Sequence, residues 1–280
     1  MRYFKIKSYA KVNLALNVVG KTHLLHKIES IVSFLDLHDE ILIKKIDNKN
    51  HKIKFVGKFS NRIKSKNSVF QLLEYIDKKK LLKNKYQIII KKNIPSEAGL
   101  GGGSMNAANI LNFLIKRKLI KNKKKEIIEI SNSIGSDVIL GLYSKNLILR
   151  SNYSIKTVAV KKKIYALIVK PDFGCSTKKI YSQVKKFTKP KFNLISRQMF
   201  SLDFLKRMKN DLEPIAFNKY PKLNTLKNFL EKLSKIEFVR MTGSGSAIIA
   251  YFNSDKKSKE AEKKVKKQFR NYWCKTAKTI

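Results

Sequence analysis

Residues 8–19 alternate between apolar side chains and small or polar ones, which is the period of two that a β-strand produces. One face carries Val12, Leu14, Leu16 and Val18, and the opposite face carries Lys11, Asn13, Ala15 and Asn17. The pattern predicts a strand with one buried face. Because Lys11 and Asn13 share the other face, their side chains can line a cleft together.

A second strand is predicted at residues 86–90, where a Tyr, a Gln and three Ile follow one another. A short polar connection then leads to residues 99–104, which include four glycines. A helix should follow, because the apolar residues between Ala107 and Ile115 fall on one helical face. Neither Gly nor Pro interrupts this stretch before about Lys118.

The remaining chain gives further elements. We predict a helix at residues 125–132 that ends near Gly135, a strand at 165–169, and a turn of small residues at 240–246 that enters a strand at 247–252. A charged helix is expected to close the chain. A length of 280 residues with 43% hydrophobic content suits one large or two medium domains. We place the boundary near residue 157, which gives an N-terminal domain of residues 1–157 and a C-terminal domain of residues 158–280.

The formal net charge of +42 raises the question of nucleic-acid binding, because counterion release gives any basic surface some affinity for phosphate chains. Lysine supplies most of this charge, and its runs are scattered, for example at residues 78–80, 123–125 and 161–163. A protein that reads bases favours Arg and clustered aromatic residues. Lys, Ile and Asn all have AT-rich codons, so genomic base composition offers a cause without a function. We therefore expect no dedicated nucleic-acid partner.

The start of the chain carries charge at every second or third position, so we expect no secretion signal. Elsewhere the apolar runs, such as residues 138–143, are far shorter than the roughly 20 residues that cross a bilayer. Cys175 and Cys274 lie far apart and form no CxxC pair, which favours neither a disulfide framework nor a zinc site. These features predict a protein of the reducing cytoplasm with no membrane partner.

The glycine-rich segment is the first candidate for chemistry. Between a strand and a helix, such a segment presents several backbone N–H groups at the positive end of the helix dipole and so forms an anion site. Residues 99–104 are not a Walker A loop, since no Gly-Lys-Ser/Thr follows. They are not a GxGxxG motif either, because Ser104 stands where the third Gly would be. A tight turn before a packed helix is the alternative, although four glycines cost backbone entropy that an ordinary turn need not incur.

Three further residues are each open to two interpretations. A strand lysine such as Lys11 is more often solvated than functional. Asp137 follows Gly135 and Ser136, where a carboxylate commonly caps a helix or stabilises a turn. His26 is a single histidine in an apolar neighbourhood, and such a residue is more often a structural hydrogen-bonding group than a ligand. Taken one at a time, none of the three identifies a site.

Taken together, five blocks resemble a known family. Residues 95–104 (PSEAGLGGGS) resemble the second motif of the galactokinase, homoserine kinase and mevalonate kinase superfamily, the GHMP kinases, and residues 240–245 (RMTGSG) resemble its third motif. Residues 10–14 (AKVNL), 26–36 (HKIESIVSFLD) and 134–138 (IGSDV) are similar to blocks of its 4-diphosphocytidyl-2-C-methyl-D-erythritol kinase branch. The blocks occur in the family's order and cover nearly the whole chain.

The resemblance implies an α+β fold in two domains, with the active site in the cleft between them, and it implies ATP and Mg²⁺ as cofactors. Asp137 would be the general base on the substrate's hydroxyl, and Lys11 would orient Asp137 and offset developing charge. ATP would contact Pro95, Ser96, Glu97, Ala98, Gly99, Leu100, Gly101, Gly102, Gly103, Ser104, Met105 and, near the adenine, Asn67. The cytidine end of the substrate would contact Asn13, Leu25, His26, Thr177 and Tyr181. The metal ligands are not indicated.

The implied activity is transfer of the γ-phosphate of ATP to the 2-hydroxyl of 4-diphosphocytidyl-2-C-methyl-D-erythritol, in the methylerythritol phosphate route to isoprenoids. The partner would be this small cytidine diphosphate substrate, and the protein a monomer or weak homodimer. One alternative is another GHMP kinase, acting on mevalonate or homoserine, although those enzymes tend to have Gly-Ser-Ser where this chain has residues 101–104. The other is a basic nucleic-acid-associated protein on a degenerate kinase fold.

Three positions depart from the branch pattern. Leu25 stands where the branch has Tyr, which removes one aromatic partner for cytosine. Met105 replaces a second Ser after the glycines, and Ile139 replaces a Pro after Asp-Val. The catalytic pair Lys11 and Asp137 is intact.

Overall fold

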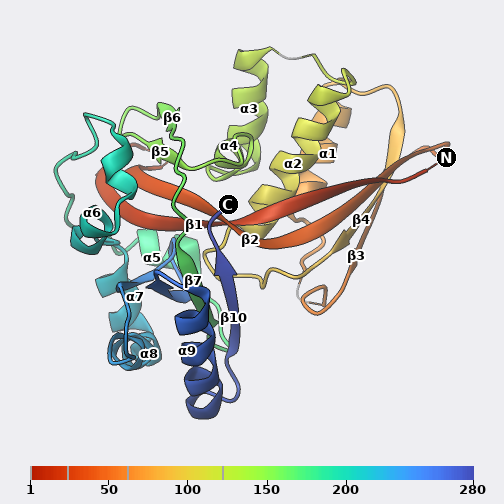
Figure 1. Cartoon of the computed structure of the whole chain (residues 1–280). Helices are drawn as coiled ribbons and strands as arrows, with labels where there is room; N and C mark the ends of the chain where they lie inside the picture. The colour runs from red at the N-terminus through yellow and green to blue at the C-terminus, as the bar shows by residue number, and fades with distance from the viewer. Residues whose placement is uncertain (1, 24, 62, 122) are drawn as a thin grey trace. The chain divides into compact units, whose positions relative to one another are not determined.

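The computed structural model describes residues 2–23, 25–61, 63–121 and 123–280. Its α+β chain divides into two compact units (Figure 1). The first unit contains the N-terminal residues through Lys11, Leu37–Ser96 and Gly101–Ser144, and the second contains Val12–Asp36, Glu97–Leu100 and Lys145–Ile280. Each unit thus combines separate segments of the chain. Two long strands, β1 (Phe4–Lys21) and β2 (His26–Ile46), contribute residues to both units.

The first unit is built around β4 (Lys85–Lys91), which pairs in parallel with β3 (Lys52–Val56) and antiparallel with the C-terminal half of β2. Its helices are α1 (Ser68–Lys78), α2 (Gly102–Lys116), α3 (Lys124–Ile134) and the short α4 (Val138–Gly141). The apolar faces of α1, α2 and α3 share one core with inward-facing strand residues such as Ile43 and Ile88. Since α2 lies against both α1 and α4 (Figure 1), its N-terminus is held in place by packing.

The second unit contains an antiparallel sheet in the order β10-β7-β9-β8. These strands are β7 (Tyr165–Lys170), β8 (Phe238–Met241), β9 (Ile248–Phe252) and β10 (Trp273–Lys278). The N-terminal half of β2 pairs with β5 (Leu147–Leu149), which pairs with β6 (Ile155–Thr157). The helices are α5 (Thr177–Tyr181), the 3₁₀ helix η1 (Arg197–Phe200), α6 (Leu202–Arg207), α7 (Glu213–Lys219), α8 (Pro221–Glu231) and α9 (Asp255–Gln268). The sheet shares a hydrophobic core with α7, α8 and α9.

The structure confirms most of the elements expected from the sequence. They are the strands at 86–90, 165–169 and 247–252, the helix after the glycines and the helix at 125–132. Helix α2 begins at Gly102, within the glycine-rich segment. Among the described residues, no helix is both long and apolar enough to cross a membrane.

Two structural expectations were wrong. The strand around residues 8–19 is buried on both faces, because Lys11 and Asn13 are each only 3% exposed. Their polar groups have partners inside the protein, so burial does not require apolar side chains there. The charged helix α9 does not close the chain, since β10 follows it and pairs with β7.

Candidate functional site

Two residues that the sequence places 126 positions apart meet in the first unit. The Nζ atom of Lys11, at the end of this unit's part of β1, lies 3.1 Å from Oδ2 of Asp137. The lysine side chain is 3% exposed, whereas the aspartate side chain is 32% exposed. A buried ammonium group thus pairs with a carboxylate that solvent can reach.

Asp137 does not use its carboxylate as a helix cap. It occupies the N-cap position of α4, but its side chain makes no capping hydrogen bond to that helix. The helix itself packs closely on α2, because a Cβ atom on Gly141 would lie 2.6 Å from Cβ of Ala108. The alternative interpretation of Asp137 as a helix cap therefore does not account for the position of its side chain, whereas pairing with Lys11 does.

The beginning of α2 lies beside this pair. Gly101 is the N-cap of α2 and adopts a left-handed backbone with φ of 69°. A Cβ atom here would lie 2.7 Å from Cγ of Lys11, so only glycine lets the lysine pass at this distance. The first N–H groups of a helix have no partner within it. The first unit thus brings Lys11, Asp137 and the backbone amides at the start of α2 together.

Asn67 and Met105, two further predicted nucleotide contacts, have structural roles. The Oδ1 atom of Asn67 caps α1 by accepting from the backbone N–H groups of Val69 (3.0 Å) and Phe70 (3.1 Å). A Cβ atom on Gly103 would lie 3.4 Å from Oγ of Ser68, so the start of α1 adjoins the start of α2. Met105 is fully buried, and its N–H donates to the carbonyl of Gly101 (2.8 Å). Whether Asn67 and Met105 also contact a nucleotide stays a prediction.

Residues Glu97–Leu100, where the glycine-rich segment begins, belong to the second unit and contact the third motif. The N–H of Ala247 donates to the carbonyl of Ala98 (3.2 Å), and the hydroxyl of Thr242 donates to the carbonyl of Gly99 (3.2 Å). Gly99 has φ of 73°, and a Cβ atom on it would lie 2.0 Å from the carbonyl oxygen of Thr242. The two motifs identified in the sequence are therefore locked together by backbone contacts that only glycine permits.

Asn13 and Thr177 also adjoin the third motif. The backbone N–H of Asn13 donates to Oγ1 of Thr242 (3.0 Å), and its side-chain Nδ2 donates to Oγ of Ser30 (2.8 Å). Thr177, the first residue of α5, has its hydroxyl 2.9 Å from that of Ser244. The structure thus brings these two predicted substrate residues to one region of the second unit.

His26, Tyr181 and Phe187 form an aromatic cluster in the second unit. The ring of His26 lies with its centroid 5.1 Å from that of Tyr181 and 6.5 Å from that of Phe187. Burial, and then the charge of Lys21, lower the pKa of His26 below its ordinary value of 6.5. Leu25 is 57% exposed at the turn before β2. The predicted substrate residues His26 and Tyr181 are therefore brought together, beside the ring of Phe187, which was not predicted.

Several residues at these places were missed by the sequence reasoning. They are Thr242, Ser244 and Phe187, together with Asp39 and Lys92, which pair with each other in the first unit beside the start of α2. Thr242 and Ser244 lie within a quoted motif, so the small hydroxyl residues between its glycines were a usable signal. Phe187 and Lys92 gave no usable signal, because each lies among lysines of the kind that are usually solvated on a protein surface.

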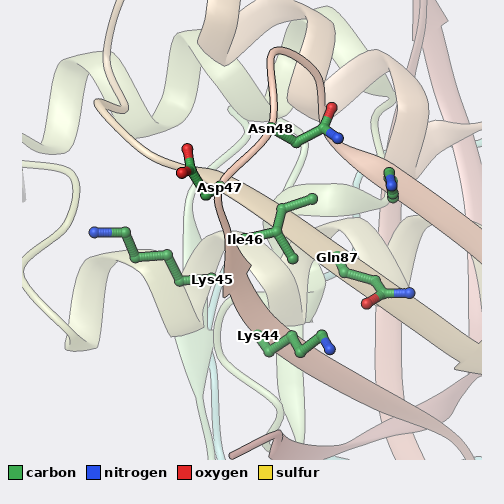
Figure 2. A pocket seen from close by; sticks show the side chains of 7 residues that line it. Lys44, Lys45, Ile46, Asp47, Asn48 and Gln87 are labelled. Carbon is green, nitrogen blue, oxygen red and sulfur yellow. The ribbon is translucent and has the colours of Figure 1, made fainter. Parts of the chain in front are cut away.

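The first unit also has a basic hollow on its surface, at the end of β2 (Figure 2). It is lined by Lys44, Lys45, Ile46, Asp47, Asn48, Lys52 and Gln87. None of these is a predicted site residue. The basic hollow is thus a feature separate from the Lys11–Asp137 pair.

Comparison with known proteins identifies the family. Residues 67–145 match the GHMP kinases N terminal domain family, and residues 184–271 match the GHMP kinases C terminal family. The chain is 53% identical, over the full length of both chains, to the 4-diphosphocytidyl-2-C-methyl-D-erythritol kinase of Pelagibacter ubique (strain HTCC1062).

Solved structures share the fold. A crystal structure of 4-(cytidine 5'-diphospho)-2C-methyl-D-erythritol kinase is similar with a TM-score of 0.75 at 22% identity, covering 98% of this chain and 99% of that chain. A homoserine kinase from Cytophaga hutchinsonii is similar with a TM-score of 0.71 at 18% identity, covering 100% and 95%. The fold is thus common to several kinases, whereas the sequence identity points to one of them. The chain belongs to the 4-diphosphocytidyl-2-C-methyl-D-erythritol kinase family of the GHMP kinases.

Proposed function

We propose that the protein transfers the γ-phosphate of ATP to the 2-hydroxyl of 4-diphosphocytidyl-2-C-methyl-D-erythritol, giving the 2-phosphate in the methylerythritol phosphate route. The observation that carries the proposal is the contact between Lys11 and Asp137 beside the first residues of α2. It fits the activity by which the relative with 53% identity is named.

In the proposed mechanism Asp137 accepts the proton of the attacking hydroxyl as the oxygen bonds to the γ-phosphorus and ADP leaves. The ammonium of Lys11 orients the carboxylate and offsets negative charge on the transferring group. The backbone amides from Gly101 to Ser104 hold the phosphates at the positive end of α2. Phosphoryl transfer relies on positioning and charge stabilisation, which these groups supply.

The cytidine end of the substrate is assigned to the second unit. His26 and Tyr181 offer a polar edge and an aromatic face, and Asn13 and Thr177 lie by the third motif. We also propose that residues 1–157 and 158–280 act as the ATP-binding and the C-terminal kinase domains. The family matches at 67–145 and 184–271 fall on either side of that boundary.

Mg²⁺ is proposed to enter with the nucleotide. Among the described residues, no group of three or more His, Cys, Asp or Glu side chains could hold a metal ion by itself. Mg²⁺ commonly takes one or two carboxylate ligands and completes its shell with substrate phosphates and water. Ser104 and Asp137 supply hard oxygen atoms of the required kind, and the ion would neutralise phosphate charge.

A turnover assay with purified full-length protein tests the assignment. With Mg·ATP and 4-diphosphocytidyl-2-C-methyl-D-erythritol, we expect one ADP for each 2-phosphate product, measured by coupled ADP release and by phosphorus NMR of the product. Consumption of ATP with mevalonate or homoserine, and none with the cytidine substrate, would show that the assignment is wrong.

A further inference from the structure

A buried ion pair lies next to the chain segment that leads into the glycine-rich loop (the glycine-rich segment of residues 99–104). Asp39 on β2 is 0% exposed, and Lys92, the residue after β4, is 2% exposed. Their side chains are directly paired, and both belong to the first unit. Burying two charges costs free energy unless further hydrogen bonds satisfy them. The hydrogen bonds around this pair therefore explain why it is tolerated in the core.

Four donors converge on the carboxylate of Asp39. Its Oδ1 accepts from the backbone N–H groups of Asn93 (2.7 Å) and Ile94 (2.8 Å), the two residues before Pro95. Its Oδ2 accepts from Nζ of Lys92 and from Nδ2 of Asn106 (2.9 Å) on α2. One carboxylate thus binds the segment that precedes the loop and the helix that follows it.

The start of α2 rests on the same residues. A Cβ atom on Gly102 would lie 3.2 Å from Nζ of Lys92 and 3.1 Å from Cγ2 of Ile94. Asn106 is 1% exposed, and its Oδ1 has no hydrogen-bond partner among the described residues. Leaving a buried carbonyl oxygen without a partner costs free energy. The side chain of Asn106 thus bonds to Asp39 through Nδ2 although its Oδ1 is left without a partner among the described residues.

We propose that Asp39, Lys92 and Asn106 are positioning residues for ATP: they fix both ends of the glycine-rich loop so that its amides point at the phosphates. The proposal rests on the assignment of this loop as the phosphate site under Proposed function. None of the three needs to touch the nucleotide, because each acts through the backbone of Asn93, Ile94 or α2.

The test measures ADP affinity by calorimetry, with KM for ATP and kcat, in the full-length protein. Asp39→Asn keeps the shape of the side chain but turns one accepting oxygen into a donor that faces Lys92 and Asn106. We expect this variant to raise the Kd for ADP and the KM for ATP about tenfold, with a smaller fall in kcat at saturating ATP. Asn106→Ala removes one donor of the four and should raise both constants about threefold, which gives a second variant should Asp39→Asn fold poorly.

Two controls separate positioning from simple stability. Ile76→Ala opens a cavity in the core of the same unit, on α1, and should lower the melting temperature without changing the Kd for ADP. Gly103→Ala adds a methyl group whose nearest neighbour would be Oγ of Ser68 at 3.4 Å, so the variant should fold while obstructing phosphate at the loop. The inference is overturned, and the loop assignment kept, if Gly103→Ala raises the Kd for ADP while Asp39→Asn and Asn106→Ala bind ADP like the wild type. Wild-type affinity in all three would overturn the loop assignment and this inference with it.

Discussion

The carboxylate of Asp137 makes no capping bond to α4 and pairs with the ammonium group of Lys11 at 3.1 Å. We therefore expect Asp137→Asn to lower kcat by about 10² or more, because an amide cannot accept the hydroxyl proton. Lys11→Ala should have a similar effect, while KM for ATP changes much less in both. Steady-state and single-turnover kinetics measure this.

Asp77→Asn is the matched control for Asp137→Asn. Asp77 is an aspartate of the same unit and of nearly equal exposure, and it pairs with Lys85 (2.7 Å) rather than with Lys11. Its replacement should leave kcat near the wild-type value. Near wild-type single-turnover rates in Asp137→Asn would instead make Asp137 an ordinary turn residue.

The lowered pKa of His26 gives a pH dependence. Burial and Lys21 both favour the neutral ring, so at pH 7 the side chain offers one donor and one acceptor. We expect KM for the cytidine substrate to be constant from pH 8 to pH 7 and to rise as pH falls below 6.5, where protonation removes the acceptor. The folded state binds this proton less readily than the unfolded chain, so the midpoint of thermal unfolding should also fall as pH falls below 6.5. His26→Gln should remove this component of both pH profiles; a KM profile equal to that of the wild type would exclude His26 from the substrate site.

The aromatic cluster of the second unit predicts how the base is held. Base stacking on an aromatic side chain is worth roughly 1 to 3 kcal/mol. Tyr181→Ala should therefore raise KM for the cytidine substrate about tenfold, and Phe187→Ala should raise it by a smaller factor, since its ring lies farther from His26. Leu25→Tyr should lower KM a few-fold by adding a ring at the turn. KM for ATP should hardly change in any of them; an unchanged KM for the cytidine substrate in Tyr181→Ala would place the base elsewhere.

At the level of elements, Glu97–Leu100, where the glycine-rich segment begins, and the third motif are held together within the second unit. Gly99→Ala places a methyl group 2.0 Å from the carbonyl oxygen of Thr242 and strains a backbone with φ of 73°. We expect a loss of roughly 2 to 5 kcal/mol in unfolding free energy. Urea unfolding measures it, with Gly20→Ala as control, since a methyl group there would lie at an ordinary contact distance of 3.7 Å from Cδ of Lys27. Equal stability of both variants would contradict the close contact.

The elements also show how far the sequence could predict the fold. Strands of apolar residues and the glycine-to-helix transition were predictable, because burial alone determines their pattern. Strand β2 was not, although it has 21 residues. It buries Glu29, Ser30, Ser33 and Asp39, and these polar positions conceal its alternation. Each of them finds hydrogen bonds with residues distant in the chain, which a local pattern cannot reveal.

The same limit applies to the candidate site. Lys11, Asp137 and the glycines were identified because their blocks resemble a family, and the structure then brought Lys11 and Asp137 into contact. Asp39 and Lys92 pair across 53 positions of sequence, and Lys92 follows another lysine in a chain with a net charge of +42. Asp39 and Lys92 differ from surface charges because they are buried, and a local sequence pattern does not show burial.

At the level of the whole molecule, the charge of +42 predicts binding of polyanions that is diffuse and sensitive to salt. Affinity for a single-stranded RNA of random sequence should fall by about 10³ or more between 50 and 200 mM salt. Filter binding or fluorescence anisotropy measures the affinity. The ATP-dependent reaction should persist at the higher salt, because in the proposed site oriented amides would hold its phosphates.

The basic hollow shown in Figure 2 is the place to test for a dedicated nucleic-acid site, since Lys44, Lys45 and Lys52 line it together. If binding is diffuse, the triple change of these lysines to Glu should weaken RNA affinity no more than the same change at the exposed Lys263, Lys264 and Lys267 of α9. Both variants alter net charge equally, so the long-range attraction falls by the same amount. Turnover should stay at the wild-type level in each, because none of these six lysines belongs to the proposed site. A loss of affinity and of salt dependence confined to the hollow variant would instead support a dedicated polyanion site there, and would revive the nucleic-acid interpretation for this surface.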